Sequence, residues 1–122
     1  MKVDVATKGK IHLGIIRGDS DSLKIQLREK NDAGAWINKP LGAGDTVYFT
    51  VKKSYLDEKK LIQKVITEFV DGKAIIQFVP NDTKGIAFGT YVYDIQITFA
   101  DGTVKTIVPP SRFEIMPEVT CE

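Results

Sequence analysis

The sequence has few of the side chains on which catalysis and metal binding depend. Its 122 residues include one cysteine, Cys121, and one histidine, His12. A single cysteine forms no disulfide within the chain, and one cysteine far from one histidine makes no zinc site. No serine lies in the Gly-x-Ser-x-Gly pattern of a hydrolase nucleophile, and His12 falls on the outward side of its segment. We therefore expect no enzyme, no cofactor and no metal ion.

The sequence also lacks an excess of charge of one sign and a long hydrophobic run. Lys and Arg number 17 against 16 Asp and Glu, which gives a net charge of +1. Proteins that bind nucleic acid are commonly far more basic, because phosphate contacts supply much of their affinity. No apolar run approaches the roughly 20 residues of a membrane-spanning helix, and residues 1–10 lack the apolar core of a signal peptide. We expect neither nucleic acid nor membrane as a partner.

What the sequence does have is a series of short segments with alternating apolar and polar residues. Tyr91, Tyr93, Ile95, Ile97 and Phe99 alternate with smaller or polar residues. Side chains in a strand point alternately to opposite faces, so this period predicts strands with one buried face. Further strands are predicted at residues 11–17, 23–28, 46–53, 73–79, 104–108 and 112–116.

Together these segments predict an all-β protein. None is joined by a helix long enough for a parallel crossover, so we expect an immunoglobulin-like antiparallel β-sandwich of seven to eight strands. The chain is expected to form a single domain over residues 1–122. Its sandwich covers residues 11–116, flanked by an N-terminal arm (1–10) and a C-terminal tail (117–122) that order on contact with a partner.

Three segments fit less regular structure. The period of residues 61–70 suits a helix or a strand, but β-branched residues and the Asp71-Gly72 dipeptide favour a strand that forms a hairpin with residues 73–79. Residues 80–88 are expected to form a loop or one short helical turn. Pro109-Pro110 cannot donate to a strand ladder, so it marks an edge or a bulge.

Acidic and basic turn residues give weak motifs. Asp19, Asp21 and Asp45 lie in turns, where carboxylates more often accept backbone hydrogen bonds than hold calcium. Arg17-Gly18-Asp19 spells an adhesion tripeptide, but Gly-Asp is also typical of the end of a strand. We expect these residues to be structural.

Exposed aromatic residues are the main binding signal. Trp36 is expected in a loop, Tyr48 on the outward face of its strand, and Tyr55 in a charged turn. Exposed rings stack on sugars and also suit protein interfaces, whereas a structural interpretation has Trp36 cap one end of the sandwich. Tyr91 is placed like a tyrosine corner, in which the hydroxyl ties the preceding loop to the strand.

Several turn and strand segments are similar to those of a known family. They resemble small structural proteins of tailed bacteriophages of Gram-positive hosts, similar to the N-terminal domain of the baseplate upper protein. The segments are Arg17-Gly18-Asp19-Ser20 and residues 44–51, 80–83, 89–95, 101–107 and 113–115.

The resemblance implies a virion or prophage component without an active site, assembled in the cytoplasm of the bacterial host. Its expected partners are other tail or baseplate proteins and further copies of itself. The alternative hypothesis is a carbohydrate-binding sandwich that recognises cell-wall glycans of the host through Trp36, Tyr48 and Tyr55.

Overall fold

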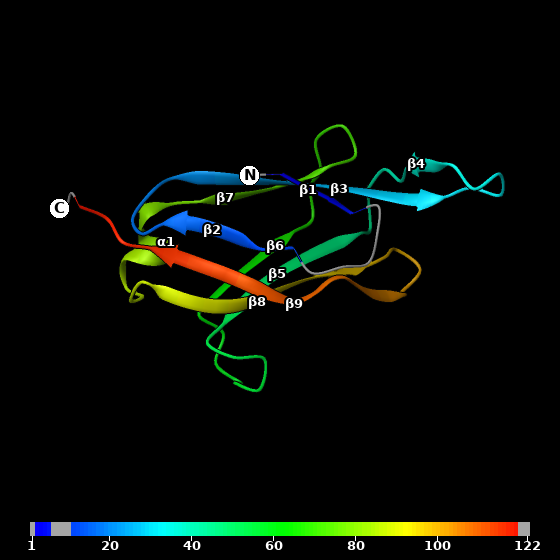
Figure 1. Cartoon of the computed structure of the whole chain (residues 1–122). Helices are drawn as coiled ribbons and strands as arrows, with labels where there is room; N and C mark the ends of the chain where they lie inside the picture. The colour runs from blue at the N-terminus through cyan, green and yellow to red at the C-terminus, as the bar shows by residue number, and fades with distance from the viewer. Residues whose placement is uncertain (1, 6–10, 120–122) are drawn as a thin grey trace.

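The computed structural model of the chain describes residues 2–5 and 11–119. These residues form two facing β-sheets and one short helix, α1 (Pro80–Lys84), at one end (Figure 1). The four-stranded sheet comprises β1 (Lys2–Val5), β3 (Asp21–Lys30), β4 (Trp36–Asn38) and β7 (Ala74–Phe78). The five-stranded sheet has the order β2 (Leu13–Ile16), β9 (Val104–Met116), β8 (Gly89–Thr98), β5 (Thr46–Lys52), β6 (Ile62–Ile66). The predicted all-β sandwich is confirmed at this level.

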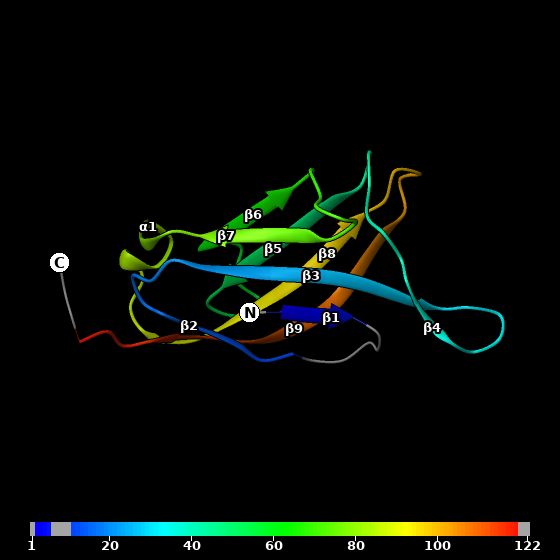
Figure 2. The same cartoon turned by 90° about the horizontal axis from the view of Figure 1, so that it is seen from above.

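The core fills the space between the sheets, whose strands cross at an angle (Figure 2). The alternation predicted for residues 91–99 is confirmed, because Tyr93, Ile95 and Ile97 are buried while the residues between them face outward. Phe49 lies at the centre of a ring cluster. Its centroid is 5.3–5.8 Å from those of Phe78, Tyr93 and Phe113. Aromatic pairs at such distances add to the hydrophobic stabilisation of a core.

Two strand pairs correct the expectation of a purely antiparallel sandwich. β1 runs parallel to β3, and β2 runs parallel to β9 with Leu13 opposite Phe113. The expected N-terminal arm also changes, since its residues 2–5 are strand β1 of the four-stranded sheet. The C-terminal tail begins with described residues, and there Glu118 binds Arg17. The rest of both segments, with Cys121, lies outside the described residues.

The hairpin predicted at Asp71-Gly72 is wrong. The strand predicted within residues 61–70 exists as β6, but it pairs with β5, whereas β7 pairs with β3 in the other sheet. The dipeptide does form a tight turn with positive φ at both residues, closed by a bridge between Val70 and Lys73. Asp71-Gly72 therefore forms the predicted tight turn, but this turn connects strands of two different sheets.

The two strands predicted around Pro109-Pro110 are one strand, β9, with an irregular register. Along β8 the partner changes from Ser111 at Tyr93 to Val108 at Ile95, and then to Thr106 at Gln96. β9 therefore contains two more residues than β8 over this stretch, which is a bulge of the predicted kind. The register leaves Asp94 without a partner on β9.

Candidate functional site

The described residues present two distinct surfaces with features of a binding site. The first is a projecting hairpin, residues 29–38, named here the hairpin arm; the second is a groove on the outer side of the five-stranded sheet. Figure 1 shows the hairpin arm extending beyond the sandwich, at the end of β3 and β4. Every residue of the arm is exposed.

The hairpin arm carries two large apolar side chains. Trp36 and Ile37 are each 44% exposed, and because they are consecutive in β4 they point to opposite faces. Trp36 was expected in a loop or as a cap on the sandwich, but it lies in a strand beyond the core, opposite Lys30. The Lys30 ammonium is 5.6 Å from the centre of the Trp36 ring, a weak cation–π contact.

Hydrogen bonds fix the base and the tip of the hairpin arm. At the base, the Gln26 side-chain amide donates to Asn38 Oδ1 at 2.6 Å, and Lys39 N donates to Leu27 O at 2.8 Å. At the tip, Asn31 Oδ1 accepts from Ala35 N at 2.9 Å. The arm is thus a defined two-stranded ribbon whose two exposed apolar side chains, Trp36 and Ile37, lie outside the core.

The second surface is built by outward side chains of β5 and β8. Thr50 lies directly opposite Asp94 in the register of these strands, and Tyr48 lies opposite Gln96. Lys52, diagonal to Asp94, is on the same face. Gln63 of β6 extends this polar face by donating to Thr50 Oγ1 at 3.3 Å.

The outer side of the five-stranded sheet is hollowed at three adjoining places, together named the outer-face groove. The central one, named the Asp94 hollow, has a volume of about 210 Å³ and is lined by Thr50, Lys52, Tyr55, Val92, Asp94 and Pro110. A hollow of about 400 Å³ shares Thr50, Lys52 and Asp94 with it and reaches Tyr48. Another of about 540 Å³ shares Tyr55, Val92 and Pro110 and reaches His12.

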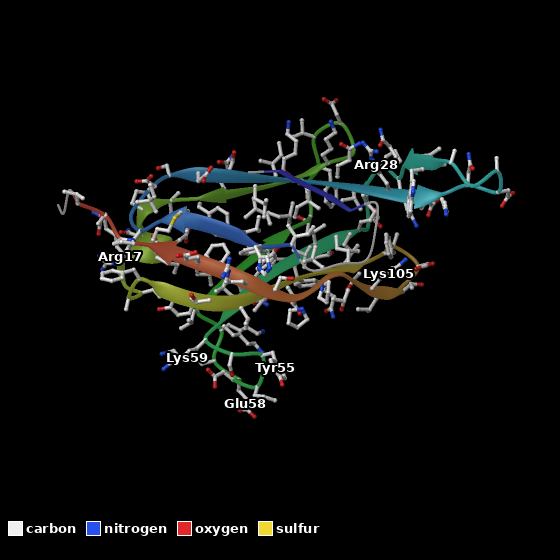
Figure 3. All side chains as sticks on the ribbon, in the orientation of Figure 1. Arg17, Arg28, Tyr55, Glu58, Lys59 and Lys105 are labelled. Atoms are coloured by element: carbon white, nitrogen blue, oxygen red, sulfur yellow. The ribbon has the colours of Figure 1, made fainter. Side chains whose placement is uncertain are left out.

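Two structural causes produce the Asp94 hollow. The bulge in β9 places Pro109 and Pro110 where the ladder would otherwise pair with Asp94. The loop of residues 53–61, which carries Tyr55, projects from the outer side of the five-stranded sheet (Figure 3). Tyr55 is 68% exposed and lines the hollow from this loop.

Asp94 is the electrostatically unusual residue of the groove. Burial raises the pKa of its carboxyl above the ordinary value, and the nearby Lys52 ammonium lowers the pKa in part. In the described part of the chain, the Asp94 carboxylate accepts no hydrogen bond and forms no ion pair. The alternation of residues 91–99 placed Asp94 on the outward face, but sequence reasoning did not identify it as a site residue. The sequence signal for this position was Pro109-Pro110, which predicted a bulge in the neighbouring strand.

The aromatic residues predicted for binding do not share one site. Tyr48 and Tyr55 both line the outer-face groove, in different hollows. Trp36 lies in the other sheet, on the hairpin arm. The structure therefore does not bring Trp36, Tyr48 and Tyr55 together in one glycan site.

The turn motifs have structural roles. Arg17 donates from Nε to Ile86 O at 2.8 Å, from Nη2 to Lys84 O, and from Nη1 to Glu118 Oε1 at 2.7 Å. The guanidinium of the Arg-Gly-Asp tripeptide is therefore bound within the protein. Asp45 likewise accepts from Gly42 N and Ala100 N, both at 3.0 Å, and so links two turns.

His12 is exposed and lines the outer-face groove. Over residues 2–5 and 11–119, no group of three or more His, Cys, Asp or Glu side chains is arranged to hold a metal ion. The same residues include no helix with the length and apolar character needed to cross a bilayer. No family model matches the chain, and no curated protein is significantly similar to it in sequence.

Proposed function

We propose that the chain is a non-catalytic structural subunit of a bacteriophage tail or baseplate, acting as a protein–protein interaction module in the virion. Its partners are other tail or baseplate proteins and further copies of the chain. It joins them in the cytoplasm of the host and needs no cofactor. The observation that carries this proposal is the hairpin arm, which displays apolar side chains on both faces outside a complete core.

A two-stranded ribbon is only marginally stable in water when nothing covers its faces. The hairpin arm presents Trp36 on one face and Ile37 on the other, and both are close to half exposed. Aromatic side chains in such positions are typical of interface centres, where Trp is enriched. An arm of this form suits insertion between neighbouring subunits, because both of its faces then become buried.

We also propose that the sandwich is immunoglobulin-like. The order β2-β9-β8-β5-β6, with β1, β3 and β7 in the facing sheet, fits a variable-type arrangement in which a strand is added beside β5. The Tyr91 hydroxyl donates to Ala87 O at 2.5 Å, as in a tyrosine corner. Segments that resemble the phage family include most of β5 and most of β8, two central strands of the five-stranded sheet.

A shortened arm provides the test. Glu29 and Ile37 are directly opposite, so replacing residues 30–36 by Asn-Gly gives a two-residue turn that removes Trp36 and leaves the sandwich intact. Tail and baseplate proteins encoded beside the gene are co-expressed with the full chain or the shortened variant. Assembly is measured by size-exclusion chromatography with light scattering.

We expect the full chain to self-associate or to form a complex with a tail protein, and the shortened variant to do neither. A full chain that stays monomeric at high concentration and binds none of the tail proteins would contradict the proposal. Assembly that is unchanged in the shortened variant would contradict the role of the arm.

A further inference from the structure

The outer-face groove contains a carboxylate that the assembly proposal does not use. Asp94 is partly buried, and among the described residues it has no hydrogen-bond or ion-pair partner. Among the described residues the Asp94 oxygens are not buried polar atoms without a partner, so they stay open to solvent and to a ligand, although partial burial of the residue disfavours its ionised form. Charged groups kept under these conditions are concentrated at binding and catalytic sites.

The residues beside Asp94 on β9 offer no side-chain donor to its carboxylate. They are Pro109 and Pro110, whose rings are apolar. Lys52 lies diagonally across on β5 and acts on Asp94 electrostatically, without forming an ion pair. The carboxylate thus faces an open hollow in which a ligand can supply hydrogen-bond donors.

The lining of the groove indicates which donors fit. In the Asp94 hollow a carboxylate, an ammonium and a hydroxyl stand beside the exposed ring of Tyr55 and the apolar ring of Pro110. Amide side chains and a further hydroxyl, from Gln63, Gln96 and Tyr48, line the adjoining hollow. A sugar combines hydroxyl groups that both donate and accept with an apolar C–H face that stacks on a ring.

Other ligand classes fit less well. A phosphate or another anion is repelled by the Asp94 carboxylate, and a cation is repelled by the Lys52 ammonium in the same hollow. The Asp94 hollow, about 210 Å³, is below the roughly 300–1,000 Å³ typical of pockets for drug-sized ligands. It opens on both sides into larger hollows, so a chain of small polar rings matches its shape better than one compact molecule.

We propose that the outer-face groove binds a neutral oligosaccharide, with one sugar ring in the Asp94 hollow between Tyr55 and Pro110. Asp94 accepts hydrogen bonds from sugar hydroxyls, Lys52 and Thr50 donate to them, and Tyr55 packs on the C–H face. Adjoining rings extend toward Tyr48 on one side and His12 on the other. This site is independent of the hairpin arm, and it does not include Trp36.

The test uses the full chain on an array of neutral oligosaccharides of glucose, galactose and N-acetylhexosamines, with sialylated and sulfated glycans as acidic controls. The neutral glycan bound most strongly is then titrated calorimetrically against the full chain and three variants. Asp94→Asn keeps the shape of the side chain but removes its charge, and Tyr55→Ala removes an exposed ring from a loop. Trp36→Ala is the matched control, an aromatic deletion on the hairpin arm.

We expect Asp94→Asn and Tyr55→Ala each to weaken binding by about tenfold or more, and Trp36→Ala to leave it unchanged. Thermal unfolding of each variant is measured in parallel, so that weaker glycan binding is distinguished from loss of the folded structure. Failure of every neutral glycan to bind, or binding of acidic glycans alone, would overturn the proposal. So would binding that survives Asp94→Asn and Tyr55→Ala but is lost in Trp36→Ala. Because assembly is assigned to the arm, any of these results leaves the assembly test unaffected.

Discussion

The strand β3 runs through two regions, the sandwich and the hairpin arm, which are stabilised by different interactions. In the sandwich its side chains Leu23 and Ile25 are fully buried, whereas its last residues, in the hairpin arm, are exposed with β4. The first region is fixed by hydrophobic burial between two sheets. The second is held by its backbone ladder, its turn and a few polar contacts, such as the Gln26–Asn38 hydrogen bond at its base. The buried core contains no side chain of residues 29–38, so the apolar residues of the arm stay exposed in the isolated chain.

Removing one large ring from each region gives the largest contrast. Phe49→Ala is expected to lower the free energy of unfolding by about 3–5 kcal/mol, because Phe49 is fully buried and touches three other rings. Trp36→Ala, the matched control on the arm, should change it by less than about 1 kcal/mol. Urea denaturation measures both. Equal decreases in the free energy of unfolding for the two variants would mean that the arm stabilises the fold as much as the core does.

The next largest effect concerns the link between the end of β2, helix α1 and the start of the C-terminal tail. Arg17→Ala removes charge-assisted hydrogen bonds to Ile86 O, Lys84 O and Glu118, and should cost about 1.5–3 kcal/mol. The exposed Arg112→Ala serves as the matched control, with an expected change within about 0.5 kcal/mol. Chemical denaturation of the two variants gives the difference. If Arg17→Ala behaves like the control, the link contributes nothing to stability.

A smaller effect is expected for the tyrosine corner. Tyr91→Phe removes the hydroxyl that donates to Ala87 O, and should lower the free energy of unfolding by about 1 kcal/mol. Tyr55→Phe removes an exposed hydroxyl and should have no measurable effect. Thermal unfolding followed by circular dichroism compares them. A neutral Tyr91→Phe would show that the hydroxyl does not stabilise the loop before β8.

The smallest effect has the opposite sign. Because burial raises the pKa of Asp94 above 3.8, its usual value, ionisation costs the folded state more than the unfolded state. The charge therefore destabilises the fold at neutral pH, and this penalty disappears as the pH falls below 3.8. Because Asp94 is only partly buried, solvent screening keeps the effect small: Asp94→Asn should raise the free energy of unfolding at pH 7 by less than about 1 kcal/mol, with the gain shrinking in acid. Denaturation at pH 7 and pH 3 measures it; a loss of stability at pH 7 would contradict this account.

The body of the sandwich could be predicted from the sequence, because a two-residue period specifies which face of a strand is buried. The alternation from Tyr91 to Phe99 gave β8 and its buried side chains correctly. Its pairing partners could not be predicted in the same way. The Asp71-Gly72 turn formed as its residues require, yet turn chemistry does not specify which sheet the next strand joins.

The candidate sites were less accessible to sequence reasoning. Trp36 and Tyr55 were identified as exposed rings, but alternation alone does not tell how far two strands extend beyond a core. The Asp94 hollow depends on the bulge opposite Tyr93 and Gln96, and so on the register of two strands. Pro109-Pro110 indicated a bulge in the sequence. Only the strand register of the structure shows that Asp94 is the residue left without a partner on β9.

Amide hydrogen exchange of the isolated chain, followed residue by residue by NMR, tests the comparison of body and arm most directly. We expect paired amides of β5 and β8 to exchange only through global unfolding, and those of the hairpin arm to exchange faster by orders of magnitude through local opening. Arm amides as slow as those of β5 and β8 would contradict the account, because they would show that the arm is held by the same cooperative structure as the core.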